Sequence, residues 1–256
     1  MSSRYAAASK AAASHFFLTA VVASLAAVLV FFVWYPWPFY EIVSGRQLFW
    51  LVIGVDVVCG PLLTLVLWNP SKSAKELAFD MSIVGLIQIA ALGYGMSTVA
   101  DTRPVRLVFE VDRMTLVTAS EIDSSRLIDA PEDLRRLRWT GPVLAGVRPP
   151  KDHQEMLQSI DLSLAGLEPS LRPGWWRTYA VSVPEVLKAA RPLATLRSGR
   201  PESTDLINEA IRAAGYSEHE LGWLPLIGGR DFDWIVLIHM TSAQPLSYAP
   251  INGFLE

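Results

Sequence analysis

Apolar residues are unevenly distributed along the chain. Three long apolar stretches occupy the first hundred residues, and an ordinary mixture of polar and apolar positions follows. The stretches are residues 16–35, 48–68 and 81–99, and only a few polar side chains interrupt them. About 20 residues in a helix span ~30 Å of hydrocarbon. The pattern therefore predicts a bundle of three transmembrane helices, preceded by a short N-terminal segment, residues 1–15.

The first apolar stretch also has features of a signal peptide, because Arg4 and Lys10 precede it. It is too long for the apolar part of such a peptide, and Trp34-Tyr35-Pro36-Trp37-Pro38 follows it in place of small residues. Aromatic side chains gather where a helix leaves the membrane. We therefore expect an uncleaved membrane anchor.

The basic residues near the ends of the predicted spans indicate the orientation, since lysine and arginine are more frequent on the cytoplasmic side. One side carries Arg4, Lys10, Lys72 and Lys75, and the other carries Arg46, Arg103 and Arg106. This bias predicts an inner-membrane protein with a cytoplasmic N-terminus. Residues 101–256 would then lie in the periplasm.

Asp56 is a single carboxylate near the middle of the second apolar stretch. A carboxyl group at such a depth costs several kcal/mol unless it is protonated or paired, so it usually faces the interior of a bundle. Gln88 and Tyr94 of the third stretch are candidate partners. Asp56 can lock two helices together by a hydrogen bond, or it can form a proton-sensitive or partner-binding site.

The remaining residues alternate between strand and helix patterns. Strand patterns occupy 105–112, 114–119, 223–227 and 234–240, with a last edge strand in 245–256; helix patterns occupy 131–137, 152–164, 184–190 and 203–214. The first two strands read as a hairpin. Pro184 is expected at a helix start and Gly215 at a helix end. The sum predicts an α+β domain with a mainly antiparallel sheet.

Two features of this domain are candidate sites. Glu110 and Asp112 are two residues apart on a strand, so both would point the same way, either as a carboxylate pair or as part of a solvated, ion-paired face. Trp175 and Trp176 could form an exposed recognition patch, cap the core or touch the lipid headgroups.

Composition excludes several classes. A net charge of -3 gives no basic field for nucleic acid. The single cysteine, Cys59, lies in an apolar stretch, so the domain has no disulfide and no zinc-thiolate site. The four histidines have no metal-ligand spacing, and no nucleophile elbow, zinc-protease motif or phosphate-binding loop is present. We expect no cofactor, no metal and no enzyme activity.

The first half of the chain resembles the TfpX/TfpZ family of type IV pilin accessory proteins. The resemblance covers about residues 34–125 and rests on the order and spacing of several short segments. These are Tyr35-Pro36, Phe39-Tyr40-Glu41, Gly45-Arg46-Gln47-Leu48-Phe49, Gly54-Val55-Asp56, Gly60-Pro61-Leu62-Leu63-Thr64-Leu65, Asn69-Pro70-Ser71-Lys72, Glu76-Leu77 to Asp80, Gln88 to Tyr94, Arg103-Pro104-Val105 and Phe109-Glu110-Val111-Asp112-Arg113.

The resemblance implies an inner-membrane factor that assists type IV pilus biogenesis by acting on the major pilin before assembly, as a chaperone or by controlling the pilin pool. Pilin, the lipid bilayer and the pilus assembly machinery are then the expected partners. The candidate partner-binding residues are Asp56, Gln88, Tyr94, Arg46, Glu110, Asp112, Trp175 and Trp176. The alternatives are a membrane-anchored periplasmic sensor or enzyme, with Glu110, Asp112 and the Gly228-Gly229 turn lining a pocket, and a structural anchor for the assembly machinery.

Overall fold

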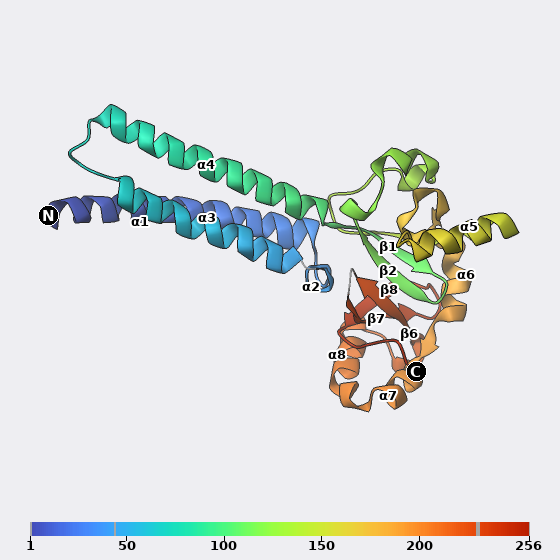
Figure 1. The fold of residues 1–256 in the computed structure, drawn as a ribbon. Helices are drawn as coiled ribbons and strands as arrows, with labels where there is room; N and C mark the ends of the chain where they lie inside the picture. Colours follow the sequence, from blue (N-terminus) through green and yellow to red (C-terminus); the bar gives the residue numbers. More distant parts are fainter. Residues whose placement is uncertain (1, 44, 229–230, 256) are drawn as a thin grey trace. The chain divides into compact units, whose positions relative to one another are not determined.

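The computed structural model describes residues 2–43, 45–228 and 231–255. The chain divides into two compact units, residues 1–102 and 103–256. Each unit has its own architecture and is described by itself (Figure 1).

The first unit is helical. It contains α1 (Ser2–Val28), which continues as the π-helix η1 (Leu29–Trp34), then α2 (Phe39–Ile42), α3 (Gly45–Leu67) and α4 (Ala74–Asp101). Three helical segments, Arg4–Trp34, Phe49–Leu67 and Ala74–Asp101, are long and apolar enough to cross a membrane. The structure thus confirms three long apolar helices where the sequence predicts them.

Helix α3 packs against both α1 and α4. Gly95 of α4 allows a close approach to α3, because a Cβ atom there would lie 2.3 Å from Cγ1 of Val52. Polar contacts add to this packing: the buried Tyr35 hydroxyl donates to the Val99 carbonyl at 2.7 Å, and His15 Nδ1 lies 2.5 Å from the Thr64 hydroxyl. The first unit is therefore held by close packing and by a few hydrogen bonds between helices.

The second unit is a mixed sheet with helices around it. Its strands are β1 (Pro104–Glu110), β2 (Arg113–Thr118), β3 (Val143–Val147), β4 (Trp176–Thr178), β5 (Arg191–Pro192), β6 (Leu221–Gly228), β7 (Asp231–His239) and β8 (Pro245–Ala249). Its α-helices are α5 (His153–Leu164), α6 (Tyr179–Ala189), α7 (Leu193–Gly199) and α8 (Thr204–Ala214). Short 3-10 helices lie between them: η2 (Ala119–Glu121), η3 (Ser124–Asp129), η4 (Glu132–Leu134), η5 (Pro169–Leu171), η6 (Pro173–Trp175), η7 (Pro201–Ser203) and η8 (Glu218–Glu220).

The strand order is β4-β3-β1-β2-β6-β7-β8, and β5 pairs with β6. The prediction of a mainly antiparallel sheet is wrong, since β1 pairs with β3 and β2 with β6 in parallel. Parallel neighbours need long crossover connections. The connections here are the 3-10 segments between β2 and β3 and helices α5 to α8 before β6. Hydrophobic periodicity locates strands without fixing their order.

The predicted hairpin is confirmed, because β1 and β2 pair antiparallel with Glu110 opposite Arg113. Strands β6 to β8 form an antiparallel meander, also as expected. The glycine at 215 ends α8 with φ of 73°, a left-handed conformation that glycine adopts without strain.

Two helix predictions need correction. The segment 131–137 forms only the short helix η4. The Leu134 and Arg136 carbonyls instead accept hydrogen bonds from the buried Arg106 guanidinium, at 2.6 and 3.0 Å. Pro184 lies inside α6, which begins at Tyr179, and the Tyr179 hydroxyl holds this earlier start by donating to the Ala243 carbonyl. In both cases a tertiary hydrogen bond decides the local structure.

Two apolar clusters stabilise the sheet. The first joins α7 and α8 to β6, β7 and β8, and the fully buried Trp223 lies within it. The second joins β1, β2 and β3 to the segment 122–134 and includes Trp176. The second cluster stabilises the end of the sheet that carries β3 and β4.

Candidate partner-binding site

A groove runs between α3 and α4 in the first unit. Its cavity is about 400 Å³, and its lining includes Val52, Val55, Asp56, Ala91 and Tyr94. The walls are almost wholly apolar. Asp56 is half-buried and is the carboxyl group of this groove.

Gln88 is the neighbour that reaches Asp56. Its Nε2 donates to the Asp56 backbone carbonyl at 3.1 Å and makes a longer contact of 3.5 Å with Oδ1. Gly60 provides the room, because a Cβ atom there would lie 2.1 Å from Gln88 Nε2. Tyr94 lines the same groove but is 78% exposed. The carboxylate oxygens of Asp56 therefore keep capacity for a further hydrogen-bond donor.

Arg46 belongs to α3, but its side chain lies outside the described part of the structure. The Gly228-Gly229 turn of the ligand-site hypothesis also lies partly outside it, since residues 229 and 230 are not described.

In the second unit the two carboxylates of the predicted pair have separate surroundings. Glu110 ends β1 and is 3% exposed. Asp112 lies in the turn and faces Arg191, with 3.4 Å between Oδ2 and Nη2. The turn residue Val111 separates them and has φ of 58°. The structure therefore does not bring Glu110 and Asp112 together.

The two tryptophans also differ. Trp176 is buried, and its Nε1 donates to the Ser170 carbonyl at 2.8 Å. Trp175 is half-buried and lies under the guanidinium of Arg148, 4.6 Å from the ring centroid. Trp176 caps the core, whereas Trp175 lines a groove.

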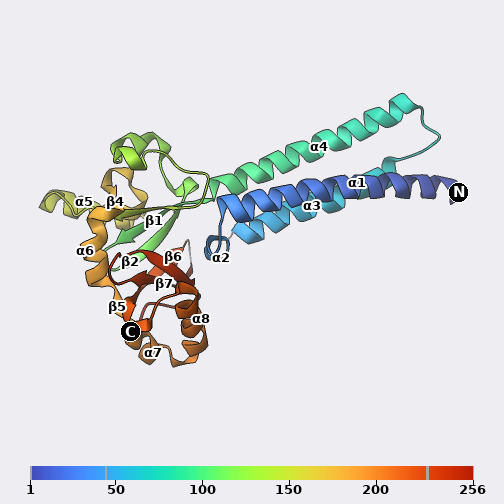
Figure 2. The same cartoon turned by 180° about the vertical axis from the view of Figure 1, so that it is seen from behind.

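This second groove has a cavity of about 400 Å³. Phe109, Val147 and Trp175 contribute apolar surface, Met156 and Ile160 of α5 form one wall, and Glu110 also faces it. Figure 2 shows α5 projecting from the domain beside the β1–β2 hairpin.

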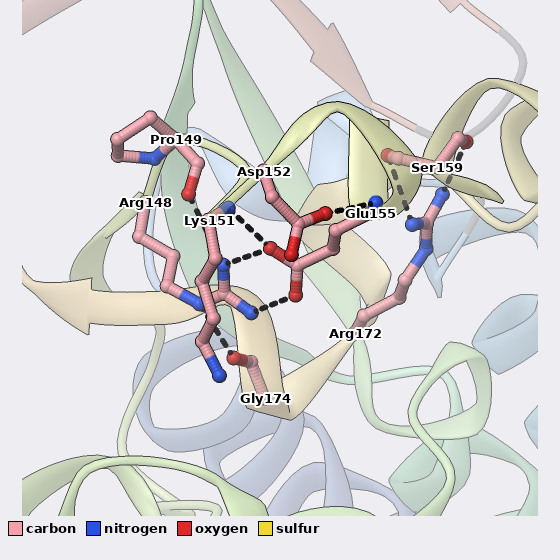
Figure 3. Close-up of polar contacts among 8 residues, drawn as sticks. All are labelled: Arg148, Pro149, Lys151, Asp152, Glu155, Ser159, Arg172 and Gly174. Carbon is pink, nitrogen blue, oxygen red and sulfur yellow. Dashed lines mark hydrogen bonds and ion pairs between the residues drawn. The ribbon is translucent and has the colours of Figure 1, made fainter. Parts of the chain in front are cut away.

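Polar contacts attach α5 to the domain (Figure 3). Arg148 forms a bidentate pair with Glu155, with Nη2–Oε1 at 2.7 Å and Nη1–Oε2 at 2.9 Å. The Lys151 backbone N–H donates to the same Glu155 carboxylate, and the Asp152 side chain caps the helix by accepting from Glu155 N–H. Further along, Arg172 donates to the hydroxyl and the carbonyl of Ser159, both at 3.0 Å.

Arg148, Glu155 and Arg172 are structural anchors that the sequence pattern alone does not reveal. The signal available for part of this was the capping pattern Asp152-x-x-Glu155, which marks a helix start. The arginines come from separate segments, so no local spacing connects them with α5.

Electrostatics follows from these contacts. The hydrogen bonds from Arg148 and from the Lys151 N–H lower the pKa of Glu155 to about 2. Burial raises the pKa of Glu110, and the Ser170 hydroxyl and the Arg113 guanidinium offset only part of that rise. The Glu155 carboxyl group is thus charged at neutral pH, whereas a new hydrogen-bond donor would stabilise the charged form of the buried Glu110.

The fold defines a class of protein. A helical unit with three helices of membrane-spanning length is joined in one chain to a mixed α/β domain, and each unit carries a groove with a carboxyl group facing it.

The chain belongs to the fimbrial assembly protein family. It is 35% identical over 237 residues to "Fimbrial assembly protein, serogroup I" of Dichelobacter nodosus, an alignment that covers 92% of each chain. It is also 35% identical over 236 residues to the serogroup E1 protein, again over 92% of each. The protein of serogroups C1 and C2 is 44% identical over 119 residues, 46% of this chain and 91% of that relative. The family described as "Fimbrial assembly protein FimB" matches residues 3–44. No solved structure matches the chain significantly.

Proposed function

We propose that this protein is a non-enzymatic, inner-membrane accessory factor of type IV pilus biogenesis, of the TfpX/TfpZ kind, that acts on the major pilin before assembly. It serves as a chaperone for the pilin or controls its pool. The observation that carries this proposal is the match over 92% of the chain to proteins named for fimbrial assembly. Because the match spans both units, the helices and the α/β domain belong to one function.

The topology follows the distribution of charge. The three helices cross the inner membrane with the N-terminus in the cytoplasm, as the basic residues near the span ends favour. The α/β domain is then periplasmic. A pilin that waits in the membrane offers a helix in lipid and a head outside it, so each of the two grooves has a matching part of the substrate.

The groove between α3 and α4 meets the pilin helix in this proposal. Its apolar walls suit a transmembrane helix, and the half-buried Asp56 is the group that needs a partner in hydrocarbon. A hydrogen-bond donor on the pilin helix would satisfy it. Asp56→Asn keeps the shape of the side chain and removes its capacity to become an anion.

Photo-crosslinking in cells tests the proposal. A photoreactive residue at Val55 or Ala91, which line the groove, should capture pilin, whereas one at Leu86, exposed on α4 but outside the groove lining, serves as the control. Pilin capture at the groove positions but not at Leu86 supports the proposal, and Asp56→Asn should reduce it. Capture of lipid and neighbouring helices alone would refute it.

A second function, binding of a small ligand by the periplasmic domain, is favoured by one observation. A cavity of about 470 Å³ lies beside Glu110 and is lined by Arg113, Thr115, Glu168 and Ser170 among others. Asp112 does not line it. A rise in melting temperature with a defined small carboxylate or amine, abolished by Thr115→Val, would support this function; no rise with any member of such a set would count against it.

A further inference from the structure

Helix α5 is amphipathic, and its apolar stripe is exposed. Met156, Leu157, Ile160 and Leu164 follow one another at helical spacing, with exposed fractions of 39%, 49%, 50% and 83%. A surface helix normally turns such a stripe toward the core. In α5, within the described residues, the buried position is Ser159.

The polar side of α5 is the side attached to the domain. Glu155 and Ser159 lie one turn apart on the helix face that Arg148 and Arg172 hold (Figure 3). Turning the stripe inward would break both sets of contacts. The orientation of the helix is therefore fixed, and its apolar stripe stays at the surface.

The stripe continues into the groove that the domain already provides. Met156 and Ile160 form one wall, and Phe109, Val147 and Trp175 contribute to the remainder of a cavity of about 400 Å³. Leu157 and Leu164 extend the apolar surface along α5 beyond this cavity. A contiguous apolar surface of this kind marks an interaction site.

Backbone strain points to the same place. Val111 lines the groove, is 82% exposed, and has φ of 58°. A β-branched residue avoids this left-handed region, and such strain costs of the order of 1–3 kcal/mol and collects at binding sites. The hairpin tip thus presents an apolar side chain to the groove instead of the glycine or asparagine that this turn conformation favours.

Charge indicates what chemistry the occupant carries. The two arginines of the groove already face acids, Arg148 with Glu155 and Arg177 with Glu185. Glu110 is 3% exposed and forms no ion pair within 4 Å among the described side chains; the Ser170 hydroxyl and, from farther away, Arg113 and Arg172 offset only part of the cost of burying its charge. The group left for a partner is therefore a carboxyl group, which calls for a basic or hydrogen-bond-donating side chain.

The same charges argue against two other occupants. A phospholipid surface offers phosphates and selects free lysines and arginines, whereas the groove arginines are engaged. A second copy of α5 carries Glu155 and Asp161 but no lysine or arginine, so it brings no such basic side chain to pair with this carboxyl group. A partner segment with one basic side chain between apolar ones would match both the apolar walls of the groove and the Glu110 carboxyl group.

We propose that α5 and the groove beside it form the docking surface for the water-exposed head of the pilin, through a segment that inserts apolar side chains against Ile160 and places a basic side chain at Glu110. This inference rests on the proposed function and specifies the part of the periplasmic domain that meets the substrate. The surface works by helix-in-groove or strand-in-groove recognition, with apolar anchors for affinity and Glu110 for selectivity.

The test uses the full chain in nanodiscs and purified, fluorescently labelled pilin in detergent, with the binding constant read from a titration. Ile160→Glu and Leu164→Glu should each weaken binding at least tenfold. The matched control is Gln158→Glu, because Gln158 is exposed on the same helix but lies outside both the apolar stripe and the attached face, and it should change binding less than twofold. Glu110→Gln should weaken binding to pilin with the basic residue intact. It should have no effect on a pilin variant in which that residue is neutral.

Each outcome is decisive. If the wild-type chain binds pilin and Ile160→Glu binds equally well, or if Gln158→Glu is as damaging, the proposed docking surface is wrong while the proposed function stands. If the wild-type chain neither binds pilin nor crosslinks to it at Val55, the proposed function fails first. Loss of a dimer on Ile160→Glu by light scattering, with pilin binding unchanged, would assign the stripe to a second copy. Protection of α5 from hydrogen exchange that requires anionic lipid and not pilin would assign the stripe to the bilayer. Either this result or the loss of a dimer would overturn the inference.

Discussion

One methyl group added at Gly146 should disturb the groove beside α5. Gly146 lies in β3, between Phe109 of β1 and Arg177 of β4, one residue before the groove begins at Val147. A Cβ atom at Gly146 would lie 1.8 Å from the Ser182 hydroxyl oxygen and 2.8 Å from Ser182 Cβ. Ser182 belongs to α6 and is fully buried.

Rotation of the Ser182 hydroxyl relieves the shorter contact and leaves the longer one. Carbon atoms of two side chains pack no closer than about 3.5 Å, so α6 and β3 must move apart by more than half an ångström. Overpacking of this kind costs about 1–3 kcal/mol. For a domain of this size, ~2 kcal/mol lowers the melting temperature by about 4–8 °C.

Thermal unfolding of the full chain in detergent, followed by tryptophan fluorescence, measures the effect of Gly146→Ala. The control is Gly174→Ala, where the nearest atom to an added Cβ is Asp129 Cβ at an ordinary 3.4 Å, and we expect a change within ~0.5 kcal/mol. In a Ser182→Gly background, Gly146→Ala should cost less than ~0.5 kcal/mol, because the opposing side chain is gone. An equal drop in both backgrounds, or an unchanged melting temperature for Gly146→Ala alone, would refute the reasoning.

Three further predictions concern the attachment of α5 and the helical unit. The pKa of Glu155 is lowered to about 2 by Arg148, so the folded state is favoured while the carboxylate is charged, and the contribution is lost as pH falls from about 4.5 toward 2. Hydrogen exchange in α5, corrected for intrinsic rates, should accelerate in that window, and equal protection at pH 6 and pH 3 would contradict this. Arg172→Met should release the Ser159 contacts and raise exchange in α5 with the melting temperature of the domain nearly unchanged; a large drop would show that the contact supports the whole domain. Tyr35→Phe removes a buried hydrogen bond and should destabilise the helical unit by ~0.5–1.5 kcal/mol in a detergent unfolding titration, and a neutral result would show that the hydroxyl adds no net stability.

Much of the candidate site follows from short stretches of sequence. Asp56 is recognisable from the sequence because a carboxylate is conspicuous in an apolar stretch. Gln88 and Tyr94 were both candidate neighbours, and the rotation of α4 relative to α3 decides that Gln88 is the one that reaches Asp56. By contrast, the expectation that Glu110 and Asp112 point the same way fails because β1 ends at Glu110 and the chain turns at Val111. A turn at one residue changes the direction of every side chain after it.

The sequence by itself determined the features that depend on neighbours along the chain: three apolar helices, the β1–β2 hairpin, the end of α8 at Gly215, and the strands of the β6–β8 meander. These follow from hydrophobic periodicity and from backbone preferences, which act over a few residues.

Only the tertiary structure decided the strand order with its parallel neighbours, the use of Arg106 to hold carbonyls that would otherwise belong to a helix, and the outward orientation of α5. In each case groups more than 20 residues apart in sequence, or from separate elements, compete with a local preference and win. The apolar stripe of α5 shows this most clearly. Its periodicity predicts a buried face, and Arg148 and Arg172 turn the opposite face to the domain because charged hydrogen bonds to Glu155 and Ser159 form only there.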